Sequence, residues 1–381
     1  MLRDPDTRFL VGHFVLSRAL YFGVGVLTAM LVAANAGVRN TPSGSVSIQA
    51  LAGTAGEALG RLVMHGDGVW YLGLIRDGYA PGPFTTGVLN NWAFFPLFPL
   101  LVGLLGGSVV AGLLVTNGAT LVASRLLMAQ VGADGGRRAA RWTVLLLLYW
   151  PFSNMLSSFR PEAIILLASV GAWMLARRGR WWAAWICVAV AALCRPPGVV
   201  VGVLVLAEAI AAERASRRRL VGALAGAIVP VAAIAIFSAY QGMVIGEPLA
   251  WLKAQAAWGR SPDIFATFAA YWTNPLFVRW RWDLAIVNWG ILALLLGAAI
   301  LLARRGRWTL AAFTAAYSIM PLLSGNLIAS GRYASTVFPA AIVGATDRLV
   351  RPARLAILVV FAGLLAAVGA WTVLELRPIL P

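Results

Sequence analysis

The feature that most constrains the fold of this chain is a succession of apolar segments, most of them long enough to cross a membrane. They occupy residues 13–36, 108–130, 142–157, 162–177, 181–195, 196–212, 219–241, 285–303, 308–324, 331–347 and 354–374. A helix crosses the hydrocarbon core of a bilayer in about 20 residues. Only 12% of the residues are charged, against about 25% in soluble domains. The sequence therefore predicts an all-α, polytopic transmembrane bundle of about eleven helices, with residues 1–381 forming one integral membrane domain.

The positive charge of the chain indicates how the bundle is oriented. The formal net charge is +17, and basic residues gather between apolar segments, at 131–141, 177–180, 213–218, 304–307 and 347–354. Clusters of this kind mark cytoplasmic loops, so we expect a multi-pass protein of the cell membrane with its N-terminus inside and its C-terminus outside. This scattered distribution is not that of a nucleic-acid-binding groove, and we expect no nucleic-acid partner.

With this orientation two long loops face outward, at residues 37–91 and 241–284. The first is expected to be partly helical between residues 57 and 79. Residues 90–107 are apolar but short and contain two prolines near their start. A full crossing there would place the basic loop at 131–141 outside. We therefore favour a re-entrant segment, which is possible where it is buried in protein, over a true crossing that breaks the charge rule once.

Ionisable and aromatic residues collect at the outer ends of these predicted helices. The set comprises Asp67, Trp70, Tyr71, Arg160, Glu162, Arg195, Gln255, Trp258, Arg260, Arg332 and Tyr333. Ionisable groups close to a membrane interior are costly and are functional candidates by default. Simpler roles remain open: Asp67 as a helix N-cap, Glu162 as a partner of a helix dipole, and the arginines as interfacial anchors.

The types of residue present limit the chemistry. The sequence has no phosphate-binding loop of the Walker type, and its two histidines, His13 and His65, offer no metal-binding spacing; we expect no metal or other cofactor. A carboxylate can act as a general base on an acceptor hydroxyl, while arginines stabilise a departing phosphate. Nucleotide donors are confined to the cytoplasm, so an outward site implies a sugar donor carried on a lipid phosphate.

Six stretches then resemble a known family. They are "GDGVWYLGLIRDGY", "AFFPLFPLL", "SSFRPEAIILLA", "CRPPGVV", "AQAAWGR" and "GRYASTVFPA", in this order between about residues 65 and 340. Together they resemble the GPI mannosyltransferase II (PIG-V) family, within the GT-C superfamily of polyprenyl-phosphate-sugar glycosyltransferases. Two positions depart from the family pattern: Gly66 stands where a Trp is usual, and only Glu162 matches the usual Tyr-Ser-Glu.

The resemblance implies a GT-C-like fold with helical outer loops and an inverting mannosyltransferase. Asp67 would be the catalytic base on the extracytoplasmic face, and Glu162 is the next candidate. The donor would be polyprenyl-phosphate-mannose, and the acceptor a glycolipid, lipoglycan or protein. We expect Arg332, with Arg195, to contact the donor phosphate, because an arginine fork matches phosphate oxygens. A lipid or solute transporter, a flippase, and a non-catalytic subunit of an envelope assembly remain alternatives.

Overall fold

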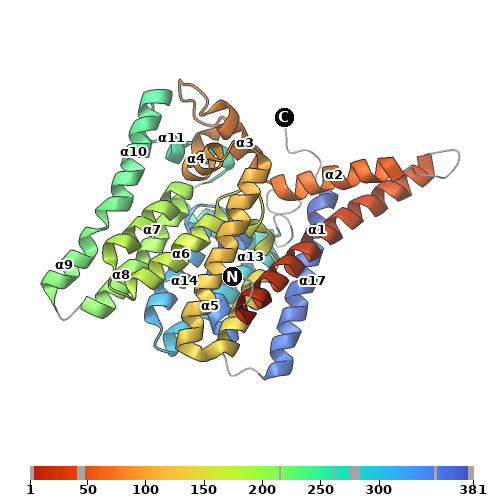
Figure 1. Cartoon of the computed structure of the whole chain (residues 1–381). Coiled ribbons are helices and arrows are strands. Elements are labelled where there is room, and N and C mark those ends of the chain that lie inside the picture. Colours follow the sequence, from red (N-terminus) through yellow and green to blue (C-terminus); the bar gives the residue numbers. More distant parts are fainter. Residues whose placement is uncertain are drawn as a thin grey trace.

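The computed structural model describes residues 4–40, 48–213, 216–260, 263–274, 276, 284–346 and 350–375. Within these ranges the regular structure is helical, and the predicted all-α bundle is confirmed (Figure 1). The α-helices are α1 (Pro5–Asn40), α2 (Ile48–Met64), α3 (Gly68–Asp77), α4 (Leu97–Leu104), α5 (Val109–Leu148), α6 (Glu162–Ala176), α7 (Trp181–Cys194), α8 (Val201–Glu213), α9 (Arg217–Ala225), α10 (Ile228–Ile245), α11 (Ala250–Lys253), α12 (Ile264–Thr273), α13 (Ala285–Arg304), α14 (Trp308–Leu323), α15 (Ser330–Ala334), α16 (Phe338–Thr346) and α17 (Arg351–Glu375). Short 3₁₀ helices are η1 (Asn91–Ala93), η2 (Ser153–Leu156), η3 (Pro196–Val200), η4 (Ala254–Trp258) and η5 (Leu327–Ala329).

Fewer of these helices than expected are long enough to span a bilayer. Among the described residues, 6 helical stretches have the length and apolar composition to cross: α1, α5, η3 with α8, α9 with α10, α13 and α17. Helices α6, α7 and α14 are apolar but shorter. The chain is thus a multi-pass membrane protein by composition, and the described helices that meet this length number 6, which differs from the expected bundle of about eleven.

Two predicted spans differ in detail from the helices observed. Helix α5 consists of two limbs joined at a kink at Gly136 (φ +81°), a backbone conformation that glycine adopts without strain, and this kink falls in the predicted loop 131–141. The second limb is the helical part of the predicted span 142–157; it ends at Leu148, and the chain continues through turns and the short η2. The span predicted at 331–347 is divided at residues 335–337 into α15 and α16.

The centre of the bundle is an apolar core formed by α5, α6, α7, α8, α13, α14 and α16. Helix α6 packs on α5, α7 and α8, and the rings of Phe159, Phe313 and Phe338 are fully buried there. Gly112 of α5 packs directly against this core, and a larger residue would not fit there, because an added Cβ would lie 2.2 Å from the ring of Phe159. This core fixes the ends of the helices from which the site is built.

The elements around the core fall into two groups. Helices α1 and α2 form a long hairpin that projects from the bundle, and α17 packs along α1 (Figure 1). Helices α3, α4 and α11 lie together at one end of the bundle (Figure 1). Since α4 has 8 residues and rises about 12 Å, it cannot cross a core of about 30 Å. This agrees with the re-entrant placement expected for residues 90–107.

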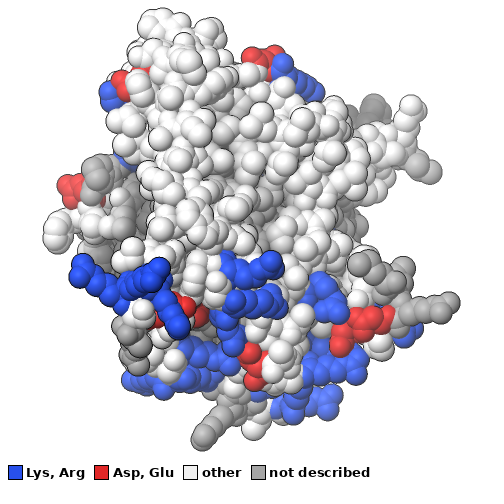
Figure 2. Space-filling model, turned by 60° about the vertical axis from the view of Figure 1, so that its left-hand side comes forward, with Lys and Arg blue, Asp and Glu red and all other residues white. Residues whose placement is uncertain are grey.

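The two ends of the molecule differ in charge. Lys and Arg side chains gather at one end of the face shown in Figure 2. The turns after α6 and α13 lie at this end, as does the start of α1, where Asp6 pairs with Arg137 and Arg141 at 2.8 and 2.9 Å. The described parts of the predicted outer loops lie at the other end; residues 41–47, 261–262, 275 and 277–283 of these loops lie outside the described residues.

Candidate active site

Asp67 lies in a three-residue break between α2 and α3. Gly66 has a φ of +69°, in the left-handed region that favours glycine, and it lies in the turn that separates α2 from α3. Asp67 itself immediately precedes α3, but its side chain makes no capping hydrogen bond. The simple interpretation of Asp67 as a helix N-cap is therefore wrong, because its carboxylate points away from the helix backbone.

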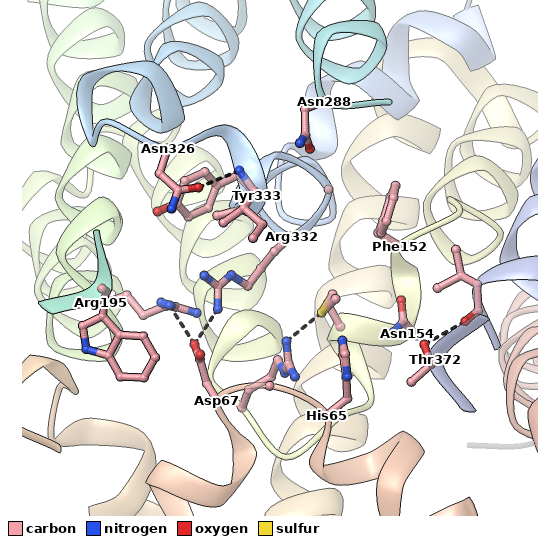
Figure 3. A pocket seen from close by; sticks show the side chains of 18 of the residues that line it. His65, Asp67, Phe152, Asn154, Arg195, Asn288, Asn326, Arg332, Tyr333 and Thr372 are labelled. Atoms are coloured by element: carbon pink, nitrogen blue, oxygen red, sulfur yellow. Dashed lines mark hydrogen bonds and ion pairs between the residues drawn. The ribbon is translucent and has the colours of Figure 1, made fainter. Parts of the chain in front are cut away.

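The carboxylate of Asp67 belongs to a closed set of charges that we call the ion ring: Asp67, Arg195, Glu162 and Arg332. Oδ2 of Asp67 lies 2.9 Å from Nη2 of Arg195 and 2.5 Å from Nη1 of Arg332 (Figure 3). Oε1 of Glu162 lies 2.5 Å from Nη1 of Arg195 and 3.5 Å from Nε of Arg332. Each acid contacts both arginines, and the ring is electrically balanced.

Proline residues help to set the positions of two members of the ring. Pro196 and Pro197 follow Arg195, and the missing N–H of proline ends α7 there. Arg195 consequently has an extended backbone (φ −164°, ψ 151°). Pro161 precedes Glu162, which becomes the first residue of α6. Arg332 comes from the short helix α15, more than 130 residues further along the chain, so only the tertiary fold completes the ring.

The arginines control the protonation of Asp67. Burial alone would raise the pKa of its carboxyl, but the charges of Arg332, Arg195 and Arg160 outweigh burial and hold that pKa below its usual range. Asp67 is therefore ionised at neutral pH. Both of its ion pairs use Oδ2, which leaves Oδ1 for a substrate.

The ion ring faces a cavity of about 1300 Å³ (Figure 3). All of the predicted site residues except Glu162 line it: Asp67, Trp70, Tyr71, Arg160, Arg195, Gln255, Trp258, Arg260, Arg332 and Tyr333. The side chain of Glu162 is 2% exposed and lies behind the two arginines. Glu162 is thus not among the residues that line the cavity, and its Oε1 contacts Arg195 and Arg332; its role as a second catalytic carboxylate stays a prediction.

One wall of the cavity is aromatic. Trp70 stacks on Phe94 with ring centroids 5.8 Å apart, and Trp258 meets Trp70 edge-on at 5.4 Å. The indole Nε1 of Trp258 has no hydrogen-bond partner in the described part of the chain. Tyr71 is almost fully buried against Phe94 and thereby fixes α3 to the bundle. Such a wall suits the apolar face of a sugar ring, and the free indole N–H suits a hydroxyl.

Sequence reasoning missed several residues that line the cavity. His65 was not among the predicted site residues, yet it lines the cavity close to Asp67, and burial, with the charge of Arg160, lowers the pKa of its imidazole to about 4. Trp150, Asn154 and the apolar residues of α17 also line it. The sequence could have indicated His65 as a cavity residue, because it lies only two residues before Asp67. It could not have indicated the residues of α17, because a lipid-facing helix and a cavity wall have the same apolar composition.

Comparison with known proteins gives a limited match. No family model matches the chain. Aquaporin-6 from Laccaria bicolor is 32% identical over 120 residues, which is 30% of this chain and 36% of that protein. A second aquaporin from the same species matches to the same extent. The chain thus spans little more than a third of the length of the curated relatives it matches, and a similarity of this extent does not assign it to their family.

Proposed function

We propose that the chain is an inverting membrane glycosyltransferase that moves mannose from polyprenyl-phosphate-mannose to a glycolipid, lipoglycan or protein acceptor. The observation that carries this proposal is the ion ring at the wall of a large, partly aromatic cavity. Asp67 keeps Oδ1 free beside Arg195 and Arg332. Transfer from a lipid phosphate uses both kinds of group: a carboxylate to accept the proton of the acceptor, and arginines to bind the phosphate. The identity of the sugar rests on the resemblance described above.

In the proposed step, the acceptor oxygen attacks the anomeric carbon of the donor sugar. The bond between this carbon and the phosphate oxygen breaks as the new C–O bond forms, and polyprenyl phosphate leaves on the opposite face. The acceptor's proton passes to Oδ1 of Asp67. General-base assistance of this kind contributes about a hundred- to ten-thousand-fold to the rate. Trp70 and Trp258 would hold the sugar, and Gln255 lies on the same cavity wall.

Because the pKa of Asp67 is low, the donor phosphate would have a second role, which is to make Asp67 a stronger base. A carboxylate paired with two arginines is a weak base. When the phosphate binds Arg332 and Arg195, it competes with Asp67 for their N–H groups and adds negative charge close to the carboxylate. Both effects raise the pKa of Asp67. In this scheme the base becomes effective when the donor is bound, which limits reaction in the absence of donor.

The basic end of the molecule supports a proposal for the side of the membrane on which the cavity opens. The arginine-rich turns lie at the end opposite to α3 and α4 (Figures 1 and 2), and such turns remain in the cytoplasm as a rule. The cavity would then open on the extracytoplasmic side, where nucleotide sugars are absent and lipid-phosphate sugars are present. We therefore propose a lipid-linked donor.

A channel is the second candidate, because the partial similarity is to aquaporins. A water path would have to continue from the cavity to the basic end. The described core between them is filled by buried apolar side chains, including Leu127, Leu147 and Val170, which is unfavourable for such a path. Swelling of proteoliposomes containing the protein, at a rate above that of empty liposomes, would favour the channel.

The purified protein tests the proposed reaction directly. It is incubated with radiolabelled polyprenyl-phosphate-mannose and, separately, with labelled GDP-mannose, in the presence of a membrane lipid extract or a candidate lipoglycan. We expect label to enter an acceptor only from the lipid-linked donor. Transfer from GDP-mannose, or no transfer to any acceptor, would contradict the proposal.

A further inference from the structure

Another cavity, of about 690 Å³, lies at the basic end of the molecule seen in Figure 2. Three helices form its wall: the start of α1, the second limb of α5 and the start of α17. Among the described residues it shares no lining residue with the cavity at the ion ring, and the proposed reaction makes no use of it. We call it the basic recess, and its lining residues are Phe9, Arg137, Arg138, Arg141, Trp142, Leu145 and Arg351.

Helical periodicity explains how the second limb of α5 lines the basic recess. Arg137, Arg141 and Leu145 are four residues apart, and residues at this spacing lie on one face of a helix. Arg138 and Trp142 have the same spacing and form the adjacent stripe. Along both stripes the arginines come first and an apolar side chain follows them. The recess therefore has a basic part and an apolar part that are fixed to the same helix.

The positive charge of the basic recess is only partly neutralised. Asp6 pairs with Arg137 at 2.8 Å and with Arg141 at 2.9 Å, although the side chains of these arginines remain 56% and 34% exposed. Arg138 and Arg351 are exposed, and no carboxylate of the described residues forms an ion pair with either of them. The recess thus keeps a net positive charge, and an anion has access to its guanidinium groups.

The deeper part of the basic recess is apolar. Leu145 is 8% exposed, and Phe9 and Trp142 are half-buried. The guanidinium carbon of Arg141 lies 4.7 Å from the centroid of the Phe9 ring, which is a favourable cation–π distance. A small soluble anion gains nothing from such a surface, whereas the glycerol and upper acyl carbons of a lipid would bury it. The recess therefore suits a molecule that has an anionic head and an apolar body.

Helix α17 extends this apolar surface away from the recess. Arg351, Leu355 and Val359 are four residues apart, so they share one face of the helix. Leu355 and Val359 are 43% and 70% exposed. Because Arg351 lines the recess, the stripe that follows it provides a contact for acyl chains whose headgroup is held by the arginines.

We propose that the basic recess binds the headgroup of an anionic phospholipid from the membrane leaflet at this end of the molecule. Basic pockets between membrane helices on the cytoplasmic side suit such headgroups. A zwitterionic headgroup adds a cation that the arginines repel, so the site should select a net negative charge. The lipid would contact α1, α5 and α17 together and fasten the starts of α1 and α17 to the core. This inference does not depend on the proposed transferase function.

Lipid binding by the purified protein tests the proposal. Full-length protein in detergent is titrated with dioleoyl phosphatidylglycerol and with dioleoyl phosphatidylcholine, which has the same acyl chains and a phosphodiester but no net charge. Native mass spectrometry gives the affinity for the first bound lipid, and thermal unfolding gives the stabilisation. We expect the wild type to bind the anionic lipid more tightly, and its Tm to rise more with that lipid.

The double variant Arg138→Gln/Arg351→Gln should bind phosphatidylglycerol about tenfold to thirtyfold more weakly, because it lacks two cationic contacts of ordinary strength. Both arginines are exposed, so this variant should keep the wild-type Tm in the absence of lipid. Each single variant should show part of the loss. Arg178→Gln/Arg180→Gln is the matched control: it removes the same charge from the exposed turn after α6, outside the recess, and should keep the wild-type affinity.

Three results would overturn the proposal. The first is a recess variant that binds both lipids as the wild type does. The second is an equal loss of affinity in the control variant, which would mean that phosphatidylglycerol responds to the charge of the whole basic end. The third is displacement of the lipid by glycerophosphoglycerol, the same headgroup without acyl chains, at a comparable concentration, since the recess would then be a site for a soluble anion.

Discussion

Replacing Glu162 by Gln tests whether the ion ring acts as one desolvated unit. The Glu162 side chain is 2% exposed, and those of Arg195 and Arg332 are 11% and 13% exposed. Glu162→Gln leaves Asp67 as the one remaining carboxylate of the ring for two arginines. Removing one partner of a buried ion pair costs about 3–5 kcal/mol, because the remaining charge stays buried without compensation.

The expected shift in melting temperature follows from the size of the chain. An unfolding entropy of about 2.1 cal/mol/K per residue gives roughly 0.8 kcal/mol/K for 381 residues. A loss of about 3–5 kcal/mol then lowers Tm by roughly 4–6 °C. Thermal unfolding of the purified protein in detergent, followed by tryptophan fluorescence, measures this shift.

Glu247→Gln is the matched control for this experiment. Glu247 also pairs with a cation at 2.5 Å, but its partner Lys253 is 50% exposed. An exposed pair contributes about 0–1 kcal/mol, so Tm should fall by no more than about 1 °C. If the two variants lost the same small amount, the ring would be solvated and the reasoning from burial would be refuted.

Three further predictions concern the same site. Arg332→Lys should keep the fold but reduce transfer by roughly tenfold to a hundredfold, since lysine cannot reproduce two bonds to a phosphate; unchanged kinetics would move the phosphate site elsewhere. Gly66→Ala should destabilise the protein by about 1–2 kcal/mol because of the positive φ and should reduce transfer, whereas Gly73→Ala, inside α3 with open space around it, should do neither. The pKa of His65 is lowered to about 4, so the folded state excludes a proton that the unfolded state binds below about pH 6.5. Stability should therefore fall between pH 6.5 and pH 4, and His65→Gln should lose this part of the pH dependence of Tm; an unchanged profile would place His65 in solvent.

The sequence predicted the class of fold, and ten of the eleven site residues that it singled out line the cavity, for identifiable reasons. Apolar segments with basic turns between them require a membrane bundle, and this orientation placed Asp67, Arg195 and Arg332 at one end of it. These polar groups are informative because they interrupt an apolar chain. Fewer helices than expected are long enough to cross, because hydropathy does not reveal that the predicted span 142–157 is helical only to Leu148, or that 331–347 is divided between α15 and α16.

The role of Glu162 and the contribution of α17 depend on tertiary packing. Whether Glu162 contacts substrate or lies behind Arg195 depends on how deep in the bundle α6 begins. A shift of α6 by one residue would change which side chain faces the cavity. The apolar face of α17 reads as lipid-exposed in sequence, although part of it closes the cavity. Arg160 was expected among the site residues, and it lines the cavity with no carboxylate of the described residues within ion-pair distance.

Single-turnover transfer by Asp67→Asn tests the central claim most directly. This variant keeps the shape of the side chain and removes the basic carboxylate, and Asp77→Asn, in the last turn of α3, is the matched control. With pre-bound polyprenyl-phosphate-mannose and acceptor lipid, Asp67→Asn should transfer about a hundred- to ten-thousand-fold more slowly while it still binds the donor. Asp77→Asn should retain most of the wild-type rate. If Asp67→Asn transferred mannose at the wild-type rate, Asp67 would not be the base and the account would be contradicted.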